Sequence, residues 1–338
     1  MSIRSYNSIL ITGGTGSFGQ EFLKEILTNY KNFKRIVVFS RDELKQWNMR
    51  LKYPENKFPQ IRFFIGDVRD KERLKRAFEN IEVVVHAAAL KQVPAAEYNP
   101  IEFIRTNVMG ADNIIQAALD SNIKKLIALS TDKAAGPINL YGATKLCSDK
   151  LFIAANNYKG SRELSFSVVR YGNVLGSRGS VIPLFLQTAK KGFVNITHED
   201  MTRFSISLSD GVKRVCNAID IAEGGEIFIP KIPSYRIMDV ANAIGPSVRK
   251  NIVGLRPGEK IHEDMILTSD SLNTFENKNN YVIIYPDETI KNEFIKKNSL
   301  VKVSENFSYC SNTNNDFLDV SQIRELIIKN LKKDFVPV

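Results

Sequence analysis

Cysteine and histidine are scarce in this chain, and neither type is arranged in a pattern that holds a disulfide or a metal. The 338 residues include three cysteines (Cys147, Cys216 and Cys310) and three histidines, all widely separated. An odd number of distant cysteines favours a reducing compartment over a disulfide framework, so we expect a cytoplasmic protein. No Cys-x-x-Cys or His-x-x-x-His pair is present, and we therefore predict no metal site.

Long hydrophobic runs are also missing, which excludes a membrane-spanning helix. No stretch approaches the roughly 20 apolar residues that a bilayer crossing needs. Residues 1–7 lack the apolar core and the cleavage site of a signal peptide. We accordingly expect neither a membrane partner nor a secretory leader.

The charge of the chain is unbalanced, with 47 Lys and Arg against 37 Asp and Glu, a formal net charge of +10. Such an excess is compatible with a nucleic-acid partner, with a site for phosphorylated small molecules, or with a solvated basic surface. The basic residues are spread along the chain, and no aromatic-and-basic stripe is present, so we predict no nucleic-acid partner.

Short apolar runs alternate with helical patterns in the first half of the chain. The runs lie at 8–12, 35–39, 61–65, 82–89, 125–130 and 165–171, and helical spacing is evident at 20–28, 70–79 and 100–121. Continuous apolar strands separated by helices predict a parallel sheet covered on both faces, a doubly wound α/β fold.

Beyond residue 172 the alternation loosens, and this change predicts the domain organisation. We predict a first domain at 1–172 and a smaller, partly discontinuous α+β lobe at 173–266, which can return strands to the first domain. From 267 to 338 the chain becomes rich in Asn and Lys, and we expect a peripheral C-terminal extension.

A glycine-rich loop stands between the first predicted strand and the first predicted helix. Gly13, Gly16 and Gly19 are spaced three apart in the segment T-G-G-T-G-S-F-G. Glycine permits a tight turn and lets backbone N–H groups approach a pyrophosphate at a helix N-terminus. The position after a strand and before a helix favours a dinucleotide site over an ordinary strand–helix turn.

The end of the second strand indicates which dinucleotide binds. NAD sites usually place an acidic residue there, whereas this strand ends in Ser40-Arg41-Asp42 and Lys45 follows. An arginine and a hydroxyl suit a 2′-phosphate, so we predict NADP. Asp42 means that NAD is not excluded as the cofactor. The alternative interpretation is that these residues form only an exposed basic loop.

The ends of the third and fourth strands offer two further cofactor contacts. Asp67 follows the third strand, where a carboxylate can accept the adenine amino group. Small residues around Ala88 follow the fourth strand. They would let the backbone lie along the cofactor, although a run of alanines is equally compatible with tight packing alone.

The end of the fifth strand is followed by a tyrosine and a lysine on one helix face. Thr131 ends the strand, and Tyr141 and Lys145 lie four residues apart. A lysine ammonium can lower the pKa of the phenol, so that the tyrosine acts as a base on an alcohol. Other Tyr-x-x-x-Lys pairs occur in the chain, but only this one follows a strand that ends at the ligand-binding edge of the predicted sheet.

Together these features resemble the extended short-chain dehydrogenase/reductase superfamily, and longer motifs resemble its inverting UDP-N-acetylglucosamine 4,6-dehydratases. The motifs lie at 13–18, 40–45, 63–70, 130–145, 171–174, 176–181, 201–204 and 256–260, and the resemblance extends over about residues 9–266. It implies a Rossmann-type fold, NADP as cofactor, UDP-N-acetylglucosamine as substrate and a homo-oligomer, either a hexamer or a dimer. The sequence departs from the family at Gln92, Gly136 and Ser205, where His, Asn and Trp are usual.

The resemblance also implies a reaction. Its product would be UDP-2-acetamido-2,6-dideoxy-beta-L-arabino-hex-4-ulose, which serves pseudaminic acid or related surface-glycan synthesis, such as flagellin glycosylation. The family chemistry oxidises C4 of the sugar, eliminates water across C5–C6 and returns hydride to C6. The implied catalytic residues are Thr131, Asp132, Lys133, Tyr141 and Lys145.

Asp132 and Lys133 carry the elimination in this interpretation, with Lys133 as the C5 base and Asp132 as the acid for the leaving hydroxyl. A neutral lysine needs burial or nearby positive charge, and a protonated aspartate needs an apolar site. An ion pair between the two would shift both pKa values in the unhelpful direction. The alternative is that this dipeptide is only a polar loop.

The other implied contacts fall into two groups. The cofactor residues are Gly13, Thr15, Gly16, Ser17, Phe18, Gly19, Ser40, Arg41, Asp42, Glu43, Leu44, Lys45, Asp67, Val68, Ala88, Lys91, Tyr141, Lys145 and Val174. The substrate residues are Lys91, Thr106, Asn107, Asn173, Val181, Thr197, Arg203, Arg256 and Glu259. Among these, Arg203 and Arg256 would pair with the diphosphate, whose geometry suits guanidinium groups.

Two other functions compete with this interpretation. A UDP-sugar 4-epimerase shares the glycine loop, Thr131, Tyr141 and Lys145, but it needs no acid–base pair for loss of water. The dipeptide Asp132-Lys133 therefore discriminates between the two enzymes. A non-catalytic NADP-binding sensor or scaffold is disfavoured because the catalytic Tyr and both lysines are present.

Overall fold

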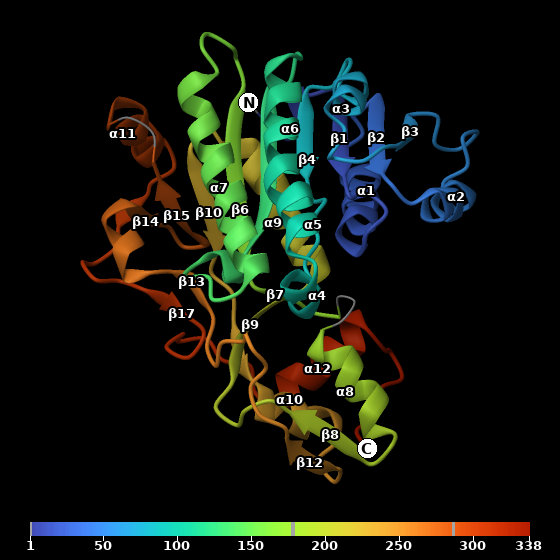
Figure 1. The fold of residues 1–338 in the computed structure, drawn as a ribbon, viewed down its shortest axis with the longest axis vertical. Helices are drawn as coiled ribbons and strands as arrows, with labels where there is room; N and C mark the ends of the chain where they lie inside the picture. The colour runs from blue at the N-terminus through green and yellow to red at the C-terminus, as the bar shows by residue number, and fades with distance from the viewer. Residues whose placement is uncertain (1, 177–179, 286–287) are drawn as a thin grey trace.

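A ten-stranded sheet forms the centre of the molecule (Figure 1). The structure, a computed structural model, describes residues 2–176, 180–285 and 288–338. Most of the sheet is parallel, in the order β3-β2-β1-β4-β5-β6-β10. These strands are β1 (Ser8–Thr12), β2 (Arg35–Ser40), β3 (Ile61–Ile65), β4 (Val83–His86), β5 (Lys125–Thr131), β6 (Ser165–Tyr171) and β10 (Glu226–Pro230). The strand order reverses between β1 and β4, which is where open parallel sheets bind ligands.

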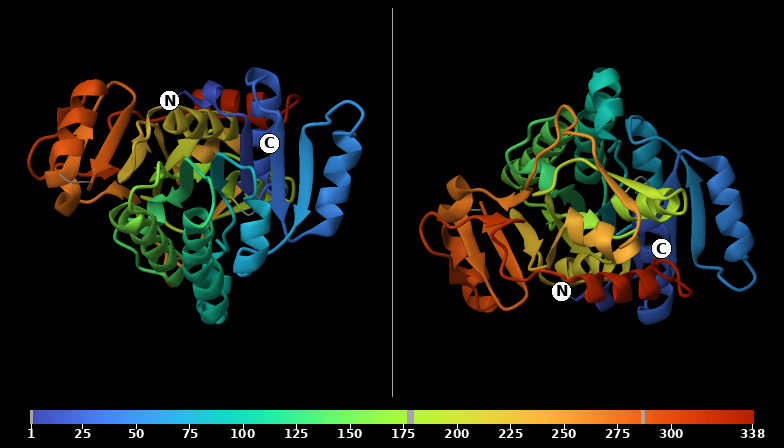
Figure 2. Two further views of the ribbon diagram at one scale, coloured as in Figure 1. Left: turned by 90° about the horizontal axis from the view of Figure 1, so that it is seen from above. Right: turned by 90° about the horizontal axis from the view of Figure 1, so that it is seen from below.

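Helices cover both faces of this sheet, which explains the continuous apolar runs in its strands (Figures 1 and 2). On one face lie α1 (Ser17–Asn29) and α9 (Leu208–Ile221), and on the other α3 (Lys71–Ala77), α6 (Gly110–Leu119) and α7 (Leu140–Tyr158). Shorter helices α2 (Glu43–Lys52), α4 (Val93–Tyr98) and α5 (Pro100–Phe103) join the strands. Every residue of β1 and β6 is buried.

The predicted doubly wound α/β fold is confirmed, with two local differences. The predicted strand at 82–89 ends at His86, because the N–H groups of Ala87 and Ala88 each donate to Thr12 Oγ1 at 3.2 Å instead of continuing the ladder. The predicted helix at 100–121 is α5, a π-helical segment (Ile104–Met109) and α6. Such π-bulges are frequent at functional sites.

A second lobe lies below the carboxyl ends of the parallel strands in Figure 1. It contains β7 (Asn173–Val174), β8 (Phe193–Ile196), β9 (Thr202–Ile206), β11 (Ser234–Arg236) and β12 (Arg249–Ile252) with α8 (Val181–Ala189), α10 (Ile237–Ile244) and α12 (Val320–Asn330). The lobe has its own apolar core, in which Phe185, Ile244 and Ile323 are buried. A segment far along the chain, α12, therefore stabilises the same core as α8 and α10.

The stretch from 267 to 338 is divided between these two units. The strands β14 (Thr274–Glu276), β15 (Asn280–Ile284) and β16 (Val301–Lys302) extend the sheet beyond β10 in antiparallel pairing. Helix α11 (Glu288–Lys297) follows β15, and β17 (Tyr309–Cys310) pairs with β13 (Asp264–Ile266). Short 3₁₀ helices lie at Ile3–Ser5, Asp132–Ala134 and Thr268–Asn273. The expected extension thus contributes to both units, while the domain boundaries at 172 and 266 stay predictions.

No helix in the described ranges is both long enough and apolar enough to cross a bilayer.

Candidate active site

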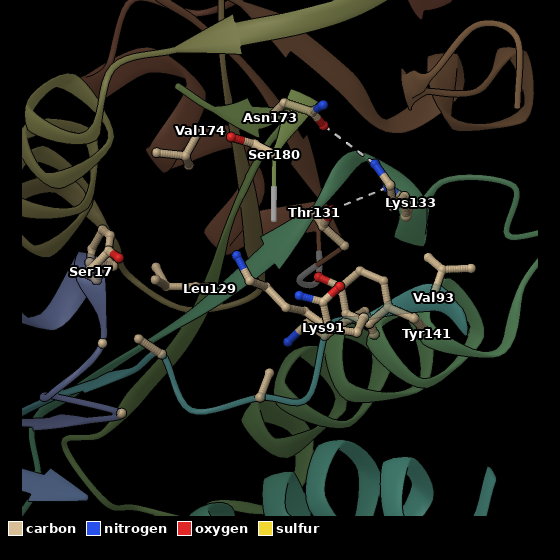
Figure 3. Close-up of a pocket in the computed structure, with 18 of the residues that line it drawn as sticks. Ser17, Lys91, Val93, Leu129, Thr131, Lys133, Tyr141, Asn173, Val174 and Ser180 are labelled. Carbon is tan, nitrogen blue, oxygen red and sulfur yellow. Dashed lines mark hydrogen bonds between the residues drawn. The ribbon is translucent and has the colours of Figure 1, made fainter. Parts of the chain in front are cut away.

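A cavity of about 950 Å³ opens between the carboxyl ends of the parallel strands and the second lobe. In Figure 3, Ser17 lies at one end of the cavity and Lys133 at the other, with Lys91, Thr131 and Tyr141 between them. Residues from the β1–α1 loop through to β9 line this one cavity. The topology therefore brings most of the predicted cofactor and catalytic residues into one cavity.

The glycine loop is shaped by close backbone contacts at the first end of the cavity. Gly13 has φ +66°, and a Cβ there would lie 2.9 Å from the Ala88 nitrogen and 3.0 Å from the Ala87 carbonyl carbon. A Cβ on Gly19 would lie 2.4 Å from Gly14. Gly16 is the N-cap of α1 and supplies no side-chain cap. The first N–H groups of α1 therefore face the cavity without an internal acceptor, as a bound phosphate requires.

The end of β2 presents polar and basic side chains to the same end of the cavity. Ser40 Oγ lies 2.6 Å from Thr15 Oγ1, which ties β2 to the glycine loop. Asp42 caps α2 by accepting from the Lys45 N–H at 2.9 Å, and its carboxylate also pairs with the Lys45 ammonium. Arg41 is half exposed and lies 3.5 Å from Asp67. The carboxylate of Asp42 is thus engaged by its own helix and by Lys45, and the half-exposed guanidinium of Arg41 lies beside it at this edge of the site.

The carboxylate of Asp67 forms ion pairs with Arg41 and Arg69. Its carboxylate accepts from the Arg69 backbone N–H at 2.9 Å and from the Arg69 guanidinium at 2.7 and 3.0 Å. Burial raises the pKa of Asp67, but the hydrogen bonds from Arg69 and the charge of Arg41 outweigh burial, so the net pKa is lowered. Asp67 is therefore ionised and bound to neighbouring side chains at the rim.

Tyr141 and Lys145 lie on the buried face of α7 beside the end of β5. Both line the cavity, as does Thr131 at the end of β5. Burial raises the pKa of Tyr141 to about 12, against the opposing effects of Lys133 and Thr131. Burial lowers the pKa of Lys145, and Asp149 one turn further along opposes that change. A tyrosine, a lysine and a threonine in this arrangement can move a proton to and from a sugar hydroxyl.

Lys133 lies at the centre of a buried ionic cluster. Its ammonium is 3.1 Å from Asp132 Oδ1, 3.1 Å from Glu263 Oε1 and 3.4 Å from Asn173 Oδ1. Burial lowers the pKa of Lys133, but the carboxylates of Asp132 and Glu263 outweigh burial and raise it. The ion pair that sequence reasoning identified as unfavourable for a neutral lysine is therefore present in this state, and Lys133 is an ammonium.

The predicted site residues divide into those that line the cavity and those that do not. The lining includes Gly13, Thr15, Gly16, Ser17, Phe18, Ser40, Arg41, Asp42, Lys45, Val68, Ala88, Lys91, Thr106, Thr131, Lys133, Tyr141, Lys145, Asn173, Val174, Val181, Thr197, Arg203, Arg256 and Glu259. The predicted residues outside this lining are Gly19, Glu43, Leu44, Asp67, Asn107 and Asp132. The part of the predicted motif at 177–179 lies outside the described residues.

Two residues of the second set have clear structural partners. Asn107, in the π-helical segment, donates to the Leu90 carbonyl at 2.8 Å and to Thr144 Oγ1 at 3.0 Å, and accepts from the Leu90 N–H at 2.9 Å. It therefore holds the chain that leads to Lys91. Asp132 is fully buried and accepts from Thr131 and Lys133. Their direct roles in binding or catalysis remain predictions.

Sequence reasoning missed Glu263 and Asn195, both of which line the cavity. Glu263 directly precedes β13, just beyond the last motif that was recognised at 256–260. Nothing in its spacing marks it, because its approach to Lys133 depends on how the loop after β12 returns to the end of β5. Among the described residues, no group of three or more His, Cys, Asp and Glu side chains is arranged to hold a metal ion.

The fold and the cavity define an enzyme class, the extended short-chain dehydrogenase/reductases, with a glycine loop at the strand-order reversal and a Thr/Tyr/Lys set beside it. The chain belongs to the polysaccharide biosynthesis protein family, whose family model matches residues 9–285.

Individual relatives agree with this assignment. A UDP-N-acetylglucosamine 4,6-dehydratase (inverting) from Campylobacter jejuni is 51% identical over 327 residues, which cover 95% of this chain and 97% of the relative. A UDP-glucose 4-epimerase from Rickettsia bellii is 40% identical, and the match covers 95% of each chain. The solved structure of Pen from Bacillus thuringiensis has a TM-score of 0.86 and 34% identity, over 97% of this chain and 98% of that one.

Proposed function

We propose that this protein is an inverting UDP-N-acetylglucosamine 4,6-dehydratase. The observation that carries the proposal is the presence of Lys133 and Tyr141 in one cavity, with the carboxylates of Asp132 and Glu263 paired to the Lys133 ammonium. Proton transfer at the C4 hydroxyl needs only Tyr141 with Thr131 and Lys145. Loss of water also needs a base near C5 and an acid near C6. The 51% identity to the Campylobacter jejuni dehydratase supports the same reaction.

NADP is the cofactor we propose, and the residues present fit a dinucleotide. The backbone cradle at Gly13, which a Cβ would fill, and the uncapped first turn of α1 suit a pyrophosphate. Arg41 and Lys45 at the end of β2 suit a 2′-phosphate, and Asp42 is engaged by Lys45. When bound, the nicotinamide would accept hydride from C4 of the sugar and return it to C6.

The substrate would occupy the end of the cavity next to the second lobe. Arg256 is exposed at the rim and suits a diphosphate. Arg203 is buried, with its guanidinium bound to the carbonyls of Thr202, Ile261 and Lys260 at 2.7–2.8 Å. It therefore places a fixed positive charge at this end of the cavity, while Asn173 lies beside Lys133, where the reacting part of the sugar would bind.

The chain's own residues would move protons in this reaction. Tyr141 takes the proton of the 4-hydroxyl, with Thr131 and Lys145 stabilising the phenolate. The resulting 4-ketone acidifies the C5 proton, which Lys133 removes. A carboxyl group adjacent to Lys133 protonates the C6 hydroxyl, and water leaves. The sequence resemblance assigns this last role to Asp132.

A UDP-sugar 4-epimerase is the second candidate, because the Rickettsia bellii relative is 40% identical over most of the chain. An epimerase needs no base at C5 and no acid at C6. The ionic cluster around Lys133 therefore favours the dehydratase.

The assay that separates the two functions uses mass spectrometry. UDP-N-acetylglucosamine is incubated with the protein and substoichiometric NADP⁺. The dehydratase converts the sugar to a product lighter by one water, whereas an epimerase gives no change of mass. Conversion without loss of water, seen as a new isomer on chromatography, would refute the proposal.

We further propose a cytoplasmic enzyme, because the described cysteines are all free. We also propose that the product of the enzyme enters pseudaminic acid or related surface-glycan synthesis. The enzyme would assemble into a homo-oligomer, either a dimer or a hexamer.

A further inference from the structure

One turn of the chain forms a wall of the cavity at the end assigned above to the substrate. Arg256, Pro257, Gly258 and Glu259 all line the cavity. The Glu259 N–H donates to the Arg256 carbonyl at 3.1 Å, and Gly258 has φ +74°. A proline followed by a glycine with positive φ is typical of a type II β-turn. The turn therefore fixes the backbone that carries Arg256, the proposed diphosphate contact.

The side chain of Asn139 connects this turn to the helix that carries Tyr141. Its amide nitrogen donates to the Gly258 carbonyl at 2.7 Å. Its amide oxygen accepts from the Gly142 N–H at 2.8 Å, which makes Asn139 the N-cap of α7. The contact is close, because a Cβ on Gly258 would lie 2.9 Å from the Asn139 Cβ. A displacement of the turn is therefore passed to the first turn of α7, where Tyr141 lies.

Lys260 makes a second connection from the same loop. Its ammonium donates to the Ala135 carbonyl at 2.9 Å. Ala135 directly follows the 3₁₀ turn that contains Lys133. Residues 133–141, which begin at Lys133 and end at Tyr141, form what we call the catalytic segment. The loop at 256–260 thus holds the catalytic segment at two points.

Asn139 and Lys260 lie outside the cavity lining, so they act on the reaction only through the residues that they hold. Resting on the proposed dehydratase function, we propose that both are positioning residues that couple binding of the diphosphate to the placement of the catalytic segment. Contacts to a remote part of a substrate raise kcat when they orient the groups that react. A diphosphate on Arg256 fixes the turn, and the two hydrogen bonds then fix the catalytic segment.

Asn139→Ser tests the first connection. Serine caps a helix about as well as asparagine, but it has no amide nitrogen to donate to Gly258. We expect kcat for loss of water from UDP-N-acetylglucosamine to fall by about tenfold or more, because small misplacements of reacting groups slow a reaction strongly. The Kd of UDP for the protein with NADP⁺ bound, measured by titration calorimetry, should stay within about threefold of the wild type. The turn keeps its own hydrogen bond in this variant.

Lys260→Met is the corresponding variant for the second connection, and Asp264→Asn is its control. The Lys260 ammonium also pairs with Asp264 at 3.2 Å. Lys260→Met removes both interactions and should lower kcat by about tenfold. Asp264→Asn removes only the partly exposed ion pair and should leave kcat within about twofold of the wild type. An equal loss of kcat in the two variants would overturn the role of the bond to Ala135.

A double-mutant cycle with Arg256→Met tests the coupling itself. Arg256→Met alone should lower kcat by about tenfold, but by no more than about twofold in the Asn139→Ser background, because the connection is already lost. Additive losses, or no loss of kcat in either single variant, would overturn the proposal. Weaker UDP binding with an unchanged kcat in Asn139→Ser would do the same. Failure of the wild type to release water would instead reject the dehydratase function itself.

Discussion

Substitution of Gly13 by alanine tests whether the cofactor loop depends on its close approach to Ala87 and Ala88, which follow β4. A Cβ at this position would lie 2.9 Å from the Ala88 nitrogen, and ordinary contact needs at least 3.4 Å, so the loop or the segment after β4 has to move. Ala88 also donates to Thr12 at 3.2 Å, and that bond would be strained. The positive φ of +66° adds its own cost.

Gly192→Ala is the control, because Gly192 also has a positive φ, +85°, but a Cβ there meets nothing within 4 Å. The left-handed conformation costs an alanine about 1–2 kcal/mol in both variants. The steric conflict at Gly13 adds about 1–3 kcal/mol. We therefore expect Gly13→Ala to lower the free energy of unfolding by roughly 2–5 kcal/mol, and Gly192→Ala by roughly 1–2 kcal/mol.

Urea denaturation measures both losses, and titration with NADP⁺ measures cofactor affinity. Gly13→Ala should weaken NADP⁺ binding by at least about tenfold, which corresponds to about 1.4 kcal/mol. Gly192→Ala should leave the affinity unchanged. Equal losses of stability in the two variants, together with unaltered NADP⁺ affinity in Gly13→Ala, would refute the argument from backbone contact.

Three further predictions concern individual side chains. Lys133→Ala should stop release of water, a loss of at least about 10²-fold, while NADP⁺ still binds; near-normal turnover in a product assay would remove Lys133 as the C5 base. Arg41→Ala should weaken NADP⁺ about tenfold more than NAD⁺, since one half-exposed guanidinium on a phosphate contributes roughly 1–2 kcal/mol; equal weakening in paired titrations would exclude the 2′-phosphate contact. Because burial raises the pKa of Tyr141 to about 12, the single-turnover rate of C4 oxidation should rise with pH up to the pKa of the bound complex. Lys145→Met should shift that profile to higher pH, because the phenolate loses a stabilising positive charge; a profile that moves to lower pH would contradict the assigned role.

The fold was predictable from the sequence because the pattern is local. The apolar runs at 8–12, 35–39 and 125–130 correspond to strands β1, β2 and β5 within one residue at each end. The glycine loop and the Tyr141/Lys145 pair were equally visible, since their spacing lies within a single turn or helix. The sequence does not predict features that depend on a single hydrogen bond to a side chain, such as the end of β4 at His86.

The acid–base cluster shows where sequence reasoning stops. Lys133 and Asp132 are neighbours in sequence and were found together, but Glu263 lies 130 positions from Lys133 and contacts it only in the folded chain. The sequence also could not show that Asp132 is fully buried and outside the cavity lining, in a 3₁₀ turn at Asp132–Ala134. The contribution of α12 to the second lobe is a long-range contact of the same kind.

The central claim is that the protein removes water from UDP-N-acetylglucosamine and inverts C5, and proton NMR in D₂O tests it most directly. UDP-N-acetylglucosamine with a trace of NADP⁺ should give a new C6 methyl signal, deuterium at C5 and the ring couplings of the L-arabino 4-keto sugar. A 4-epimer with no methyl signal, or a methyl product with the D-xylo configuration retained at C5, would contradict the account.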